Sequence, residues 1–301
     1  MKDASPRTSV VIPCYRDDRF LAAALQSVAG QTQQPQEIIV IDDGSPEPLK
    51  QPDFWQGPPL RWIRTKNHGL GAARNQGIRL AEGELIGLLD ADDLWEPEKL
   101  AVQESALDQN ANAVACYTQC VAEAGFYEFG PYPEQNLNKP QLAAKLWYGQ
   151  FFPPSSVLMN RNAALEVGGF REGLKNGEDL DMWFRLFTQG EIVGVEQALT
   201  KYRIHEGQIT SSAVRTVLGQ KEARRDILQR HADLLIAGGI ASQDLWDAYR
   251  QKVANVYFRR NFSAARPMLW DYWKDHPADW RMLMYWMLSH VPARFVAMVK
   301  D

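Results

Sequence analysis

The sequence predicts an α/β fold: an open, mostly parallel sheet with helices on both faces, followed by a C-terminal helical region. In the first 213 residues, short continuous apolar runs alternate with segments of helical periodicity. This alternation is typical of parallel strands that are buried on both faces. From residue 214 onward the pattern is that of amphipathic helices. We therefore expect an α/β domain over residues 1–213 and a helical region over residues 214–301.

Each expected strand is a short apolar run, rich in β-branched residues, that stops at a turn or a proline. The strands are expected at residues 8–15, 37–45, 60–65, 84–90 and 113–121. Helices are expected between them at residues 18–31, 69–83 and 97–108, with Asp17 or Asp18 as a cap of the first and Pro97 in the first turn of the last. Two further helices are expected at residues 214–238 and 242–261.

Composition and charge argue against several classes of protein. The three cysteines, Cys14, Cys116 and Cys120, are too few for a disulfide scaffold and lack partners at zinc-finger spacing. No apolar run reaches the roughly 18 residues of a membrane span, and no signal-peptide core is present, so we expect a cytoplasmic protein. The first 214 residues carry a net charge of −9 and the remainder +5. An acidic front half argues against nucleic acid as a partner.

Carboxylates follow two of the expected strands at the points where the strands end. Asp42 and Asp43 come after the second strand, and Asp90, Asp92 and Asp93 come after the fourth. In open α/β sheets, ligands bind beyond the carboxyl ends of the strands. Like charges this close favour either contact with water or a cation between them, and Mg²⁺ and Mn²⁺ prefer such oxygen ligands. The pattern therefore predicts a metal or ligand site at this edge.

Other nucleotide-binding motifs fit poorly. The glycines Gly69 and Gly71 are followed by Arg74 where a dinucleotide fingerprint needs Gly or Ala, and the first strand–helix turn contains no glycine. The segment that starts at Asp90 lacks the glycine and glutamate of a calcium-binding EF-hand loop.

Six short motifs occur in an informative order: VVIPCYR, IIVIDDGS, NHGLGAARNQGI, LLDADD, NGEDLDMWFRL and YRIHEGQITSS. Together they resemble a family 2 glycosyltransferase of the GT-A fold, of the type that builds bacterial cell-surface polysaccharides. The resemblance covers residues 10–212, and the ordered set is far more specific than any one motif.

The resemblance implies a donor site for a nucleoside diphosphate sugar, with a UDP-sugar as the first expectation. The implied donor-binding residues are Pro13, Tyr15, Asp42, Asp43, Arg74, Asp90 and Asp92. Asp43 would accept a hydrogen bond from the base, and Asp42 would orient its loop. Arg74 would lie near the nucleotide or the diphosphate. An acidic turn and a helix-surface arginine remain the structural alternatives.

The resemblance also implies a metal site and a catalytic base. Asp92 and His205 would bind a divalent cation, Mn²⁺ or Mg²⁺. Asp179 would remove the proton of the acceptor hydroxyl, with Glu178 beside it, and Asp181 would lie on the acceptor side. The alternative for these acids is a helix N-terminus, where negative charge is favourable.

The expected activity is an inverting, metal-dependent hexosyl or N-acetylhexosaminyl transfer to a saccharide or lipid-linked acceptor, in cell-surface polysaccharide or glycolipid synthesis. Two alternatives stay open. A nucleotidyltransferase would need a glycine-rich basic loop after the first strand, and the segment PCYRDD lacks one. A catalytically silent sugar-nucleotide-binding or scaffold protein would not need Asp92 and Asp179.

The C-terminal segment combines aromatic and basic residues. They are Trp270, Tyr272, Trp273, Trp280, Tyr285 and Trp286 together with Arg259, Arg260, Arg266, Arg281 and Arg294. Such residues on amphipathic helices suit an anionic membrane interface, so we expect peripheral contact with the inner face of the cytoplasmic membrane. Packing on the α/β domain or in a dimer is the alternative.

Overall fold

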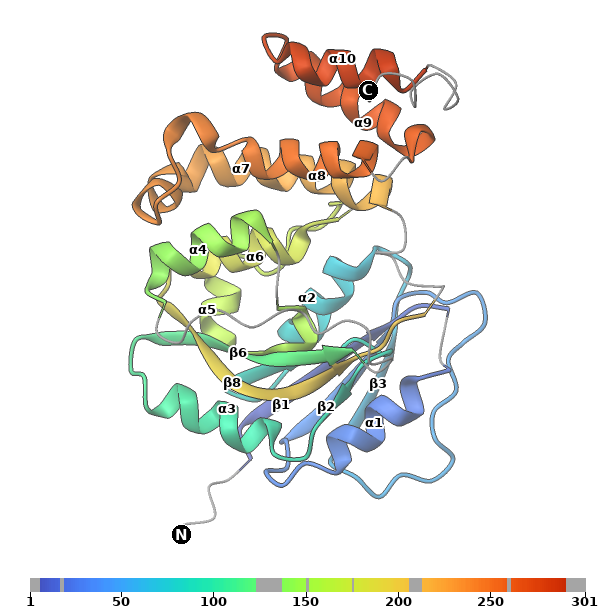
Figure 1. Cartoon of the computed structure of the whole chain (residues 1–301). Coiled ribbons are helices and arrows are strands. Elements are labelled where there is room, and N and C mark those ends of the chain that lie inside the picture. Colours follow the sequence, from blue (N-terminus) through green and yellow to red (C-terminus); the bar gives the residue numbers. More distant parts are fainter. Residues whose placement is uncertain are drawn as a thin grey trace.

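The computed structural model is a stack of layers, with a sheet covered by helices on both faces toward one end and the C-terminal helices at the other (Figure 1). The structure describes residues 6–16, 19–122, 137–149, 152–174, 176–205, 213–258 and 261–290. The cap candidates Asp17 and Asp18, and Arg259, Arg260 and Arg294, lie outside these ranges. Among the described residues, no helix is both long and apolar enough to cross a membrane.

The sheet has eight strands in the order β3-β2-β1-β4-β7-β6-β8-β5. They are β1 (Thr8–Cys14), β2 (Glu37–Asp42), β3 (Leu60–Arg64), β4 (Leu85–Leu88), β5 (Leu94–Trp95), β6 (Ala113–Ala122), β7 (Val157–Asn160) and β8 (Glu191–Tyr202). The four strands β3, β2, β1 and β4 are parallel, as is the pair β6–β8. The pairs β4–β7, β7–β6 and β8–β5 are antiparallel. The expected open, mostly parallel sheet is confirmed, with a mixed second half.

The alternation of side chains along the strands divides the core into two layers. Val11, Ile39 and Ile86 point to the face covered by α2, α4 and α6, whereas Val10 and Ile38 point to the face covered by α1 and α3. Because successive strand residues face opposite sides, continuous apolar runs are needed to fill both layers. The runs that predicted the strands therefore also account for the helices on both faces.

The helices of the α/β part lie on both faces of the sheet (Figure 1). They are α1 (Leu21–Ala29), α2 (Leu70–Leu80), α3 (Lys99–Asp108), α4 (Lys139–Tyr148), α5 (Arg161–Glu166) and α6 (Glu178–Leu186), with a 3₁₀ turn at Pro154–Ser156. Local signals set some of the ends. In α4, for example, Asn138 and Gln141 form a reciprocal capping box. Helix α6 begins after Gly177, whose φ of 85° is a left-handed conformation that favours glycine.

The C-terminal region is helical, as expected. It contains α7 (Ala213–Ala237), α8 (Asp247–Phe258), α9 (Phe262–Asp275) and α10 (Trp280–Leu288), with a 3₁₀ turn at Ser242–Asp244. Ile227 and Leu235 of α7 join the core of the α/β part, whereas α8, α9 and α10 build a core of their own around Tyr249, Val253 and Met268. The start of α7 coincides with the boundary expected at residue 213, and the division into two domains stays a prediction.

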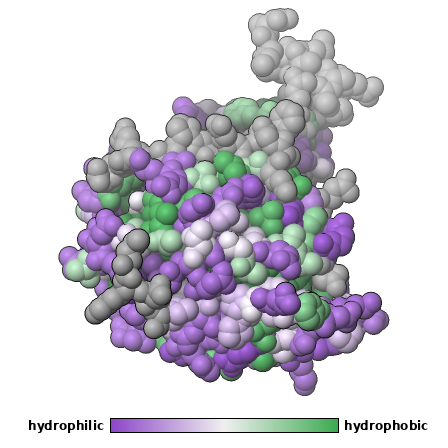
Figure 2. All heavy atoms as spheres, turned by 90° about the horizontal axis from the view of Figure 1, so that it is seen from below, coloured by the Kyte–Doolittle hydropathy of each residue, from purple (hydrophilic) through white to green (hydrophobic). Residues whose placement is uncertain are grey.

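The face of the molecule seen from the sheet end is mostly hydrophilic, with scattered apolar side chains (Figure 2). This view looks at the molecule from below the orientation of Figure 1 and so from the side opposite α9 and α10.

Candidate active site

The carboxyl ends of β1, β2 and β4 lie at one edge of the sheet, because these three strands are parallel neighbours. Pro13 is buried within β1, and Tyr15 follows the strand with 40% of its surface exposed. The guanidinium of Arg16 lies over the Tyr15 ring, 4.8 Å from its centre. An exposed aromatic ring beside a strand end is suited to stack on a flat base. The donor roles of Pro13 and Tyr15 stay predictions.

Asp42 is buried and organises the loop that follows β2. Its Oδ1 accepts from the backbone N–H of Ser45 at 2.9 Å, and Oδ2 lies 3.7 Å from Nε of Arg64. Since the side chain is 1% exposed, these contacts occupy it within the protein. The geometry agrees with a loop-orienting role and leaves little of Asp42 for a ligand.

Asp43 fixes the start of helix α2. Its two carboxylate oxygens accept from the backbone N–H groups of His68 and Gly69, at 3.0 and 2.9 Å. The side chain of Asn67 donates to the carbonyl of Asp43 at 2.9 Å. Each carboxylate oxygen retains a second lone pair for a further donor. Base recognition by Asp43 stays a prediction, and the structure adds a loop contact that the sequence did not suggest.

Arg74 of α2 is the central cation of the site. Its Nη2 donates to both carboxylate oxygens of Asp90, at 2.7 and 3.1 Å, and its Nη1 donates to Oε1 of Glu178 at 3.0 Å. The residue is 1% exposed and stacks on Phe170. Although burial opposes the charge, the carboxylates of Asp90 and Glu178 raise its pKa above that of an ordinary arginine. The surface-arginine alternative is therefore wrong.

Asp92 and His205 meet although 113 residues separate them. Oδ2 of Asp92 lies 2.9 Å from Nε2 of His205. Burial, followed by the charge of Asp90, raises the pKa of Asp92, and the hydrogen bond with His205 opposes that rise. A carboxylate oxygen and an imidazole nitrogen are both ligands that Mn²⁺ accepts. The two side chains proposed from the sequence as metal ligands are thus in contact.

Asp93 points away from this pair into the protein. It is fully buried, its Oδ2 accepts from the Ser155 hydroxyl at 2.5 Å, and its Oδ1 accepts from the Arg203 N–H at 3.1 Å. The same hydroxyl of Ser155 accepts from the N–H of Asp90 at 3.0 Å. Burial, with the charges of Asp92 and Asp90, raises the pKa of Asp93 well above its usual range. Ser155, which the sequence did not single out, therefore positions the acidic segment.

Glu178 and Asp179 form the first turn of α6, where the helix dipole favours negative charge. Oδ1 of Asp179 accepts from the N–H of Leu180 at 2.7 Å. Burial and the neighbouring charge of Asp179 raise the pKa of Glu178 to about 7, against the opposing charge of Arg74. The carboxylate of Glu178 is thus paired with Arg74. The base role of Asp179 stays a prediction.

Asp181 lies on the inner side of the same helix. It is 2% exposed, and its Oδ2 accepts from Nε and Nη2 of Arg185 at 2.8 and 2.6 Å. The contact is an ion pair one turn apart on α6. These contacts are structural, and the acceptor-side role expected for Asp181 stays a prediction.

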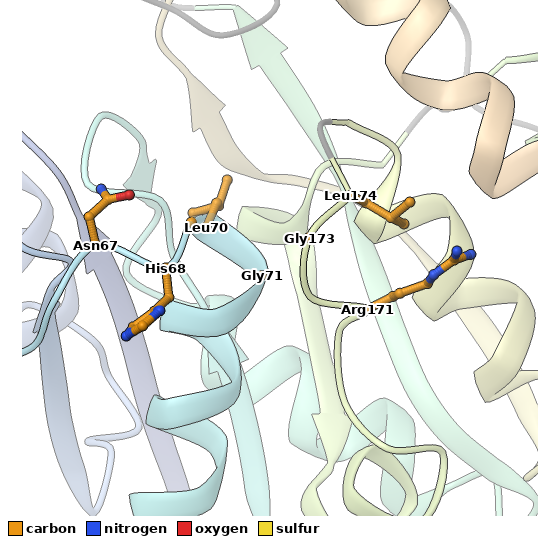
Figure 3. Close-up of a pocket in the computed structure, with 8 residues that line it drawn as sticks. Asn67, His68, Leu70, Gly71, Arg171, Gly173 and Leu174 are labelled. Atoms are coloured by element: carbon orange, nitrogen blue, oxygen red, sulfur yellow. The ribbon is translucent and has the colours of Figure 1, made fainter.

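A pocket of about 300 Å³ lies between the start of α2 and the segment before α6 (Figure 3). It is lined by Asn67, His68, Gly69, Leu70, Gly71, Arg171, Gly173 and Leu174. A Cβ at Gly71 would lie 3.8 Å from Cγ of Glu178, so the pocket borders the acidic end of α6. Three of its residues are glycines, so part of its wall is backbone.

Asn75 is a site residue whose role the sequence left open. Its Nδ2 donates to the carbonyl of Phe170 at 2.7 Å, and its Oδ1 accepts from the N–H of Phe170 at 2.6 Å. Asn75 thereby fixes the pocket-lining segment to α2. Its place directly after Arg74 in the motif GAARN was the available signal.

Within the described ranges, no group of three or more His, Cys, Asp or Glu side chains forms a complete cation site.

The sequence of the chain is similar to those of known glycosyltransferases. The chain is 28% identical over 215 residues to an uncharacterised glycosyltransferase of Rickettsia typhi, which covers 70% of this chain and 68% of that protein. It is 26% identical over 211 residues to chondroitin synthase of Escherichia coli, covering 68% of this chain and 30% of the synthase. The chain thus spans less than a third of that longer relative.

Two solved structures share the fold. TarS of Staphylococcus aureus (residues 1–349), solved with UDP-GlcNAc, has a TM-score of 0.60 and 18% identity and covers 83% of this chain and 72% of that one. The mannosyltransferase PcManGT of Pyrobaculum calidifontis, solved with GDP-Man and Mn²⁺, has a TM-score of 0.58 and 16% identity and covers 95% and 86%. The GT-A fold expected from the sequence is confirmed.

The family model for glycosyl transferase family 2 matches residues 9–168, just over half of the chain. The matched range contains β2, β4, α2 and all but the first residue of β1. These elements carry or adjoin the residues expected on the donor side. The chain belongs to glycosyltransferase family 2.

Proposed function

We propose that this chain is an inverting, metal-dependent enzyme that transfers a sugar from a nucleoside diphosphate sugar to an acceptor hydroxyl. The observation that carries the proposal is the contact of Arg74 with both Asp90 and Glu178. It joins the acidic end of β4, expected to bind the donor, to the acidic start of α6, expected to carry the base. The complexes of TarS with UDP-GlcNAc and of PcManGT with GDP-Man support a nucleotide-sugar donor.

In the proposed reaction, the carboxylate of Asp179 takes the proton of an acceptor hydroxyl. The hydroxyl oxygen forms a bond to the anomeric carbon from the face opposite the diphosphate. The bond from that carbon to the diphosphate oxygen breaks, and its electron pair leaves with the nucleoside diphosphate. Removal of the proton matters because a neutral hydroxyl is a poor nucleophile. Inversion follows from the single displacement.

Asp92 and His205 would hold the divalent metal, with the diphosphate oxygens of the donor as further ligands. These two side chains suit a divalent cation because they offer one carboxylate oxygen and one imidazole nitrogen, which lie 2.9 Å apart. They lie at the edge of the sheet where the nucleotide sugar is proposed to bind. When bound there, such a cation neutralises the charge of the leaving diphosphate. Asp90 keeps its ion pair with Arg74, and Asp93 keeps the segment in place.

The acceptor site is proposed at the pocket between residues 67–71 and 171–174, because that pocket borders Glu178. An acceptor there would bring its hydroxyl to the start of α6. The sugar is proposed to be a hexose or an N-acetylhexosamine, and the acceptor a saccharide or lipid-linked saccharide of cell-surface polysaccharide or glycolipid synthesis. The relation to chondroitin synthase supports a polysaccharide product.

A thermal-shift screen tests the donor assignment. UDP-GlcNAc, GDP-mannose and related nucleotide sugars are added with Mn²⁺ or with EDTA, and we expect at least one to raise the melting temperature by several degrees with Mn²⁺. Slow release of UDP or GDP without acceptor would separate an enzyme from a silent binding protein. Binding of every nucleotide sugar without release would favour the scaffold alternative. Release of pyrophosphate from a nucleoside triphosphate and a sugar phosphate would favour a nucleotidyltransferase.

We also propose that α9 and α10 contact the cytoplasmic face of the membrane, with the enzyme itself in the cytoplasm. Trp280 is 62% exposed, and Met287 and Trp270 are exposed as well. Tyr272 and Met282 are buried in the helical core, so only part of the aromatic set faces outward. Residues 262–290 carry three basic and three acidic residues. Apolar burial, rather than charge, would therefore provide most of the binding free energy.

Flotation with liposomes tests this contact. The full chain should float with vesicles of mixed anionic and zwitterionic lipid, and Trp280→Asp should release it. Phe54→Asp is the matched control, because Phe54 is 76% exposed on the α/β part. If the full chain stays unbound, or if both variants lose binding equally, the membrane proposal is wrong.

A further inference from the structure

The segment between α5 and α6 carries both a wall of the pocket and the approach to Asp179. On one side it is attached to α2, because Asn75 bonds the N–H and the carbonyl of Phe170. Asn75 also donates to Oε1 of Glu172 at 3.0 Å. The two bonds to the backbone of Phe170 fix the position of that residue, but not of the seven residues that follow it before α6.

On its other side the segment is attached to α7 of the C-terminal region. Arg171 donates from Nη1 to Asp226 and from Nη2 to Glu222, two carboxylates one turn apart on the helix. The planar fork of arginine can serve two acceptors at once, and this fixes direction as well as distance. The side chains of Arg171 and Asp226 are 31% and 21% exposed. Ion pairs this exposed to solvent add little to the free energy of unfolding, so their main effect is to fix the position of the segment.

The same helix contacts the segment again just before the expected base. A Cβ at Gly177 would lie 3.1 Å from Cγ of Gln220, and a Cβ at Gly219 would lie 2.6 Å from Cβ of Asn176. Lys252 of α8 in turn donates to Oε1 of Gln220 at 3.2 Å. Helix α7 therefore contacts the segment at Arg171 and again at Asn176 and Gly177, two residues before Asp179.

We propose that Arg171 is a positioning residue through which α7 sets the place of Asp179 and of the pocket wall. The C-terminal helical region then affects catalysis through the position of this segment, without contact with the substrate. In Figure 3 the Arg171 side chain extends away from the pocket, so it acts through the segment and not by touching the acceptor. The inference rests on the proposed function in one respect, the role of Asp179 as the base.

The test compares Arg171→Met, Arg171→Lys and the partner variant Glu222→Gln/Asp226→Asn with the wild-type chain. Arg225→Met is the matched control, because Arg225 also lies on α7 but pairs with Asp275 of α9, away from the segment. Hydrogen–deuterium exchange of peptides covering residues 168–182 reports the segment directly. Release of UDP or GDP from UDP-GlcNAc or GDP-mannose with Mn²⁺, whichever the wild type hydrolyses, reports catalysis.

We expect Arg171→Met and the partner variant to behave alike. Exchange in residues 171–180 should accelerate several-fold, and kcat should fall roughly 10-fold or more, because small displacements of a reacting group are costly. The KM for the donor should stay within about threefold. Arg171→Lys should recover part of the rate, since it keeps one ion pair, and Arg225→Met should match the wild type in both measurements.

Three results would overturn the proposal. Unchanged exchange in both Arg171→Met and the partner variant would show that the ion pairs hold nothing in place. A slow Arg171→Met beside a normal partner variant would mean that Arg171 itself meets the substrate. An equal loss in Arg225→Met would point to general destabilisation. Asp179→Asn in the same series keeps the two hypotheses apart: if it retains the rate, the base assignment fails while the exchange data still decide the role of Arg171.

Discussion

Arg74 donates to both carboxylate oxygens of Asp90, at 2.7 and 3.1 Å, from a side chain that is almost fully buried. Nη1 of the same guanidinium donates to Oε1 of Glu178, which lies 104 residues further along the chain. One cation thus holds two acidic segments that would otherwise repel each other. This contact makes the end of β4 and the start of α6 a single site.

Replacing Arg74 with Met should destabilise the protein strongly. The change leaves the carboxylates of Asp90 and Glu178 partly buried without their cation, a loss of about 3 kcal/mol in the free energy of unfolding. Arg79→Met is the matched control, because Arg79 on the same helix is 58% exposed and lies 3.8 Å from Glu172. That control should change stability by no more than about 0.5 kcal/mol. Denaturant unfolding measures both, and equal effects would contradict the role given to Arg74.

Gly44 should not tolerate alanine. Its φ is 69°, and a Cβ would lie 2.4 Å from the backbone nitrogen of Asn67. The variant must strain the backbone and displace the loop that Asp43 holds, which we expect to cost more than about 2 kcal/mol and to weaken nucleotide binding. Gly239→Ala is the control, since Gly239 has a φ of 96° but open space around it. Thermal shifts with UDP and Mn²⁺ should fall for the first variant only.

Lys99 should make stability depend on pH. Burial lowers the pKa of this amine from its ordinary value of 10.5 to about 7, and the residue is fully buried against Trp95. Between pH 7 and 10.5 the folded state binds fewer protons than the unfolded state, so stability rises with pH in that window. Below pH 7 both states are protonated, and the cost of the buried charge is fully present.

Lys99→Met removes that cost. It should raise the free energy of unfolding by about 2–4 kcal/mol at pH 6, and the gain should shrink as the pH approaches 9. Lys145→Met, at an exposed position of α4, should show no such trend. A gain that is the same at pH 6 and pH 9 would contradict a lowered pKa of Lys99.

The contact between Asp92 and His205 predicts a metal effect that needs no acceptor. UDP should raise the melting temperature far more with Mn²⁺ than with EDTA. Asp92→Asn and His205→Ala should each remove most of that difference, while Asp108→Asn, an exposed acid of α3, should keep it. Equal stabilisation by UDP in Mn²⁺ and in EDTA would show that no metal takes part in donor binding.

Strands β1, β2 and β4 of the parallel half were predictable because they are buried on both faces. The runs that contain Val10, Ile39 and Ile86 gave β1, β2 and β4, and their acidic ends gave the edge of the site. Strands β5 and β7 were missed, since two residues carry no periodicity and the short apolar run of β7 cannot be told from a helical segment by periodicity alone. Strand β8 was missed because the exposed residues Glu196 and Gln197 interrupt its apolar run.

The sequence predicted individual residues of the site but not the contacts between them. Motif resemblance selected Arg74, Asp90 and Glu178, but not the ion pairs among them, because contacts between residues far apart depend on how the helices pack on the sheet. The attachment of Arg171 to α7 was hidden for the same reason. Asn75 and Ser155 were missed as positioning residues because asparagine and serine are common in turns and caps, where no such role is needed.

The central claim is that Asp179 is the base of a sugar transfer, and single-turnover release of nucleoside diphosphate tests it most directly. Asp179→Asn keeps the shape of the side chain and removes the proton acceptor. With the donor chosen by the thermal-shift screen, with Mn²⁺ and with a saturating acceptor or water, the rate should fall by roughly 10² or more, the scale of general-base catalysis, while the Kd of the donor stays within about threefold. A rate close to that of the wild type, with the donor bound equally well, would contradict the account and move the base to another residue, Asp181 first.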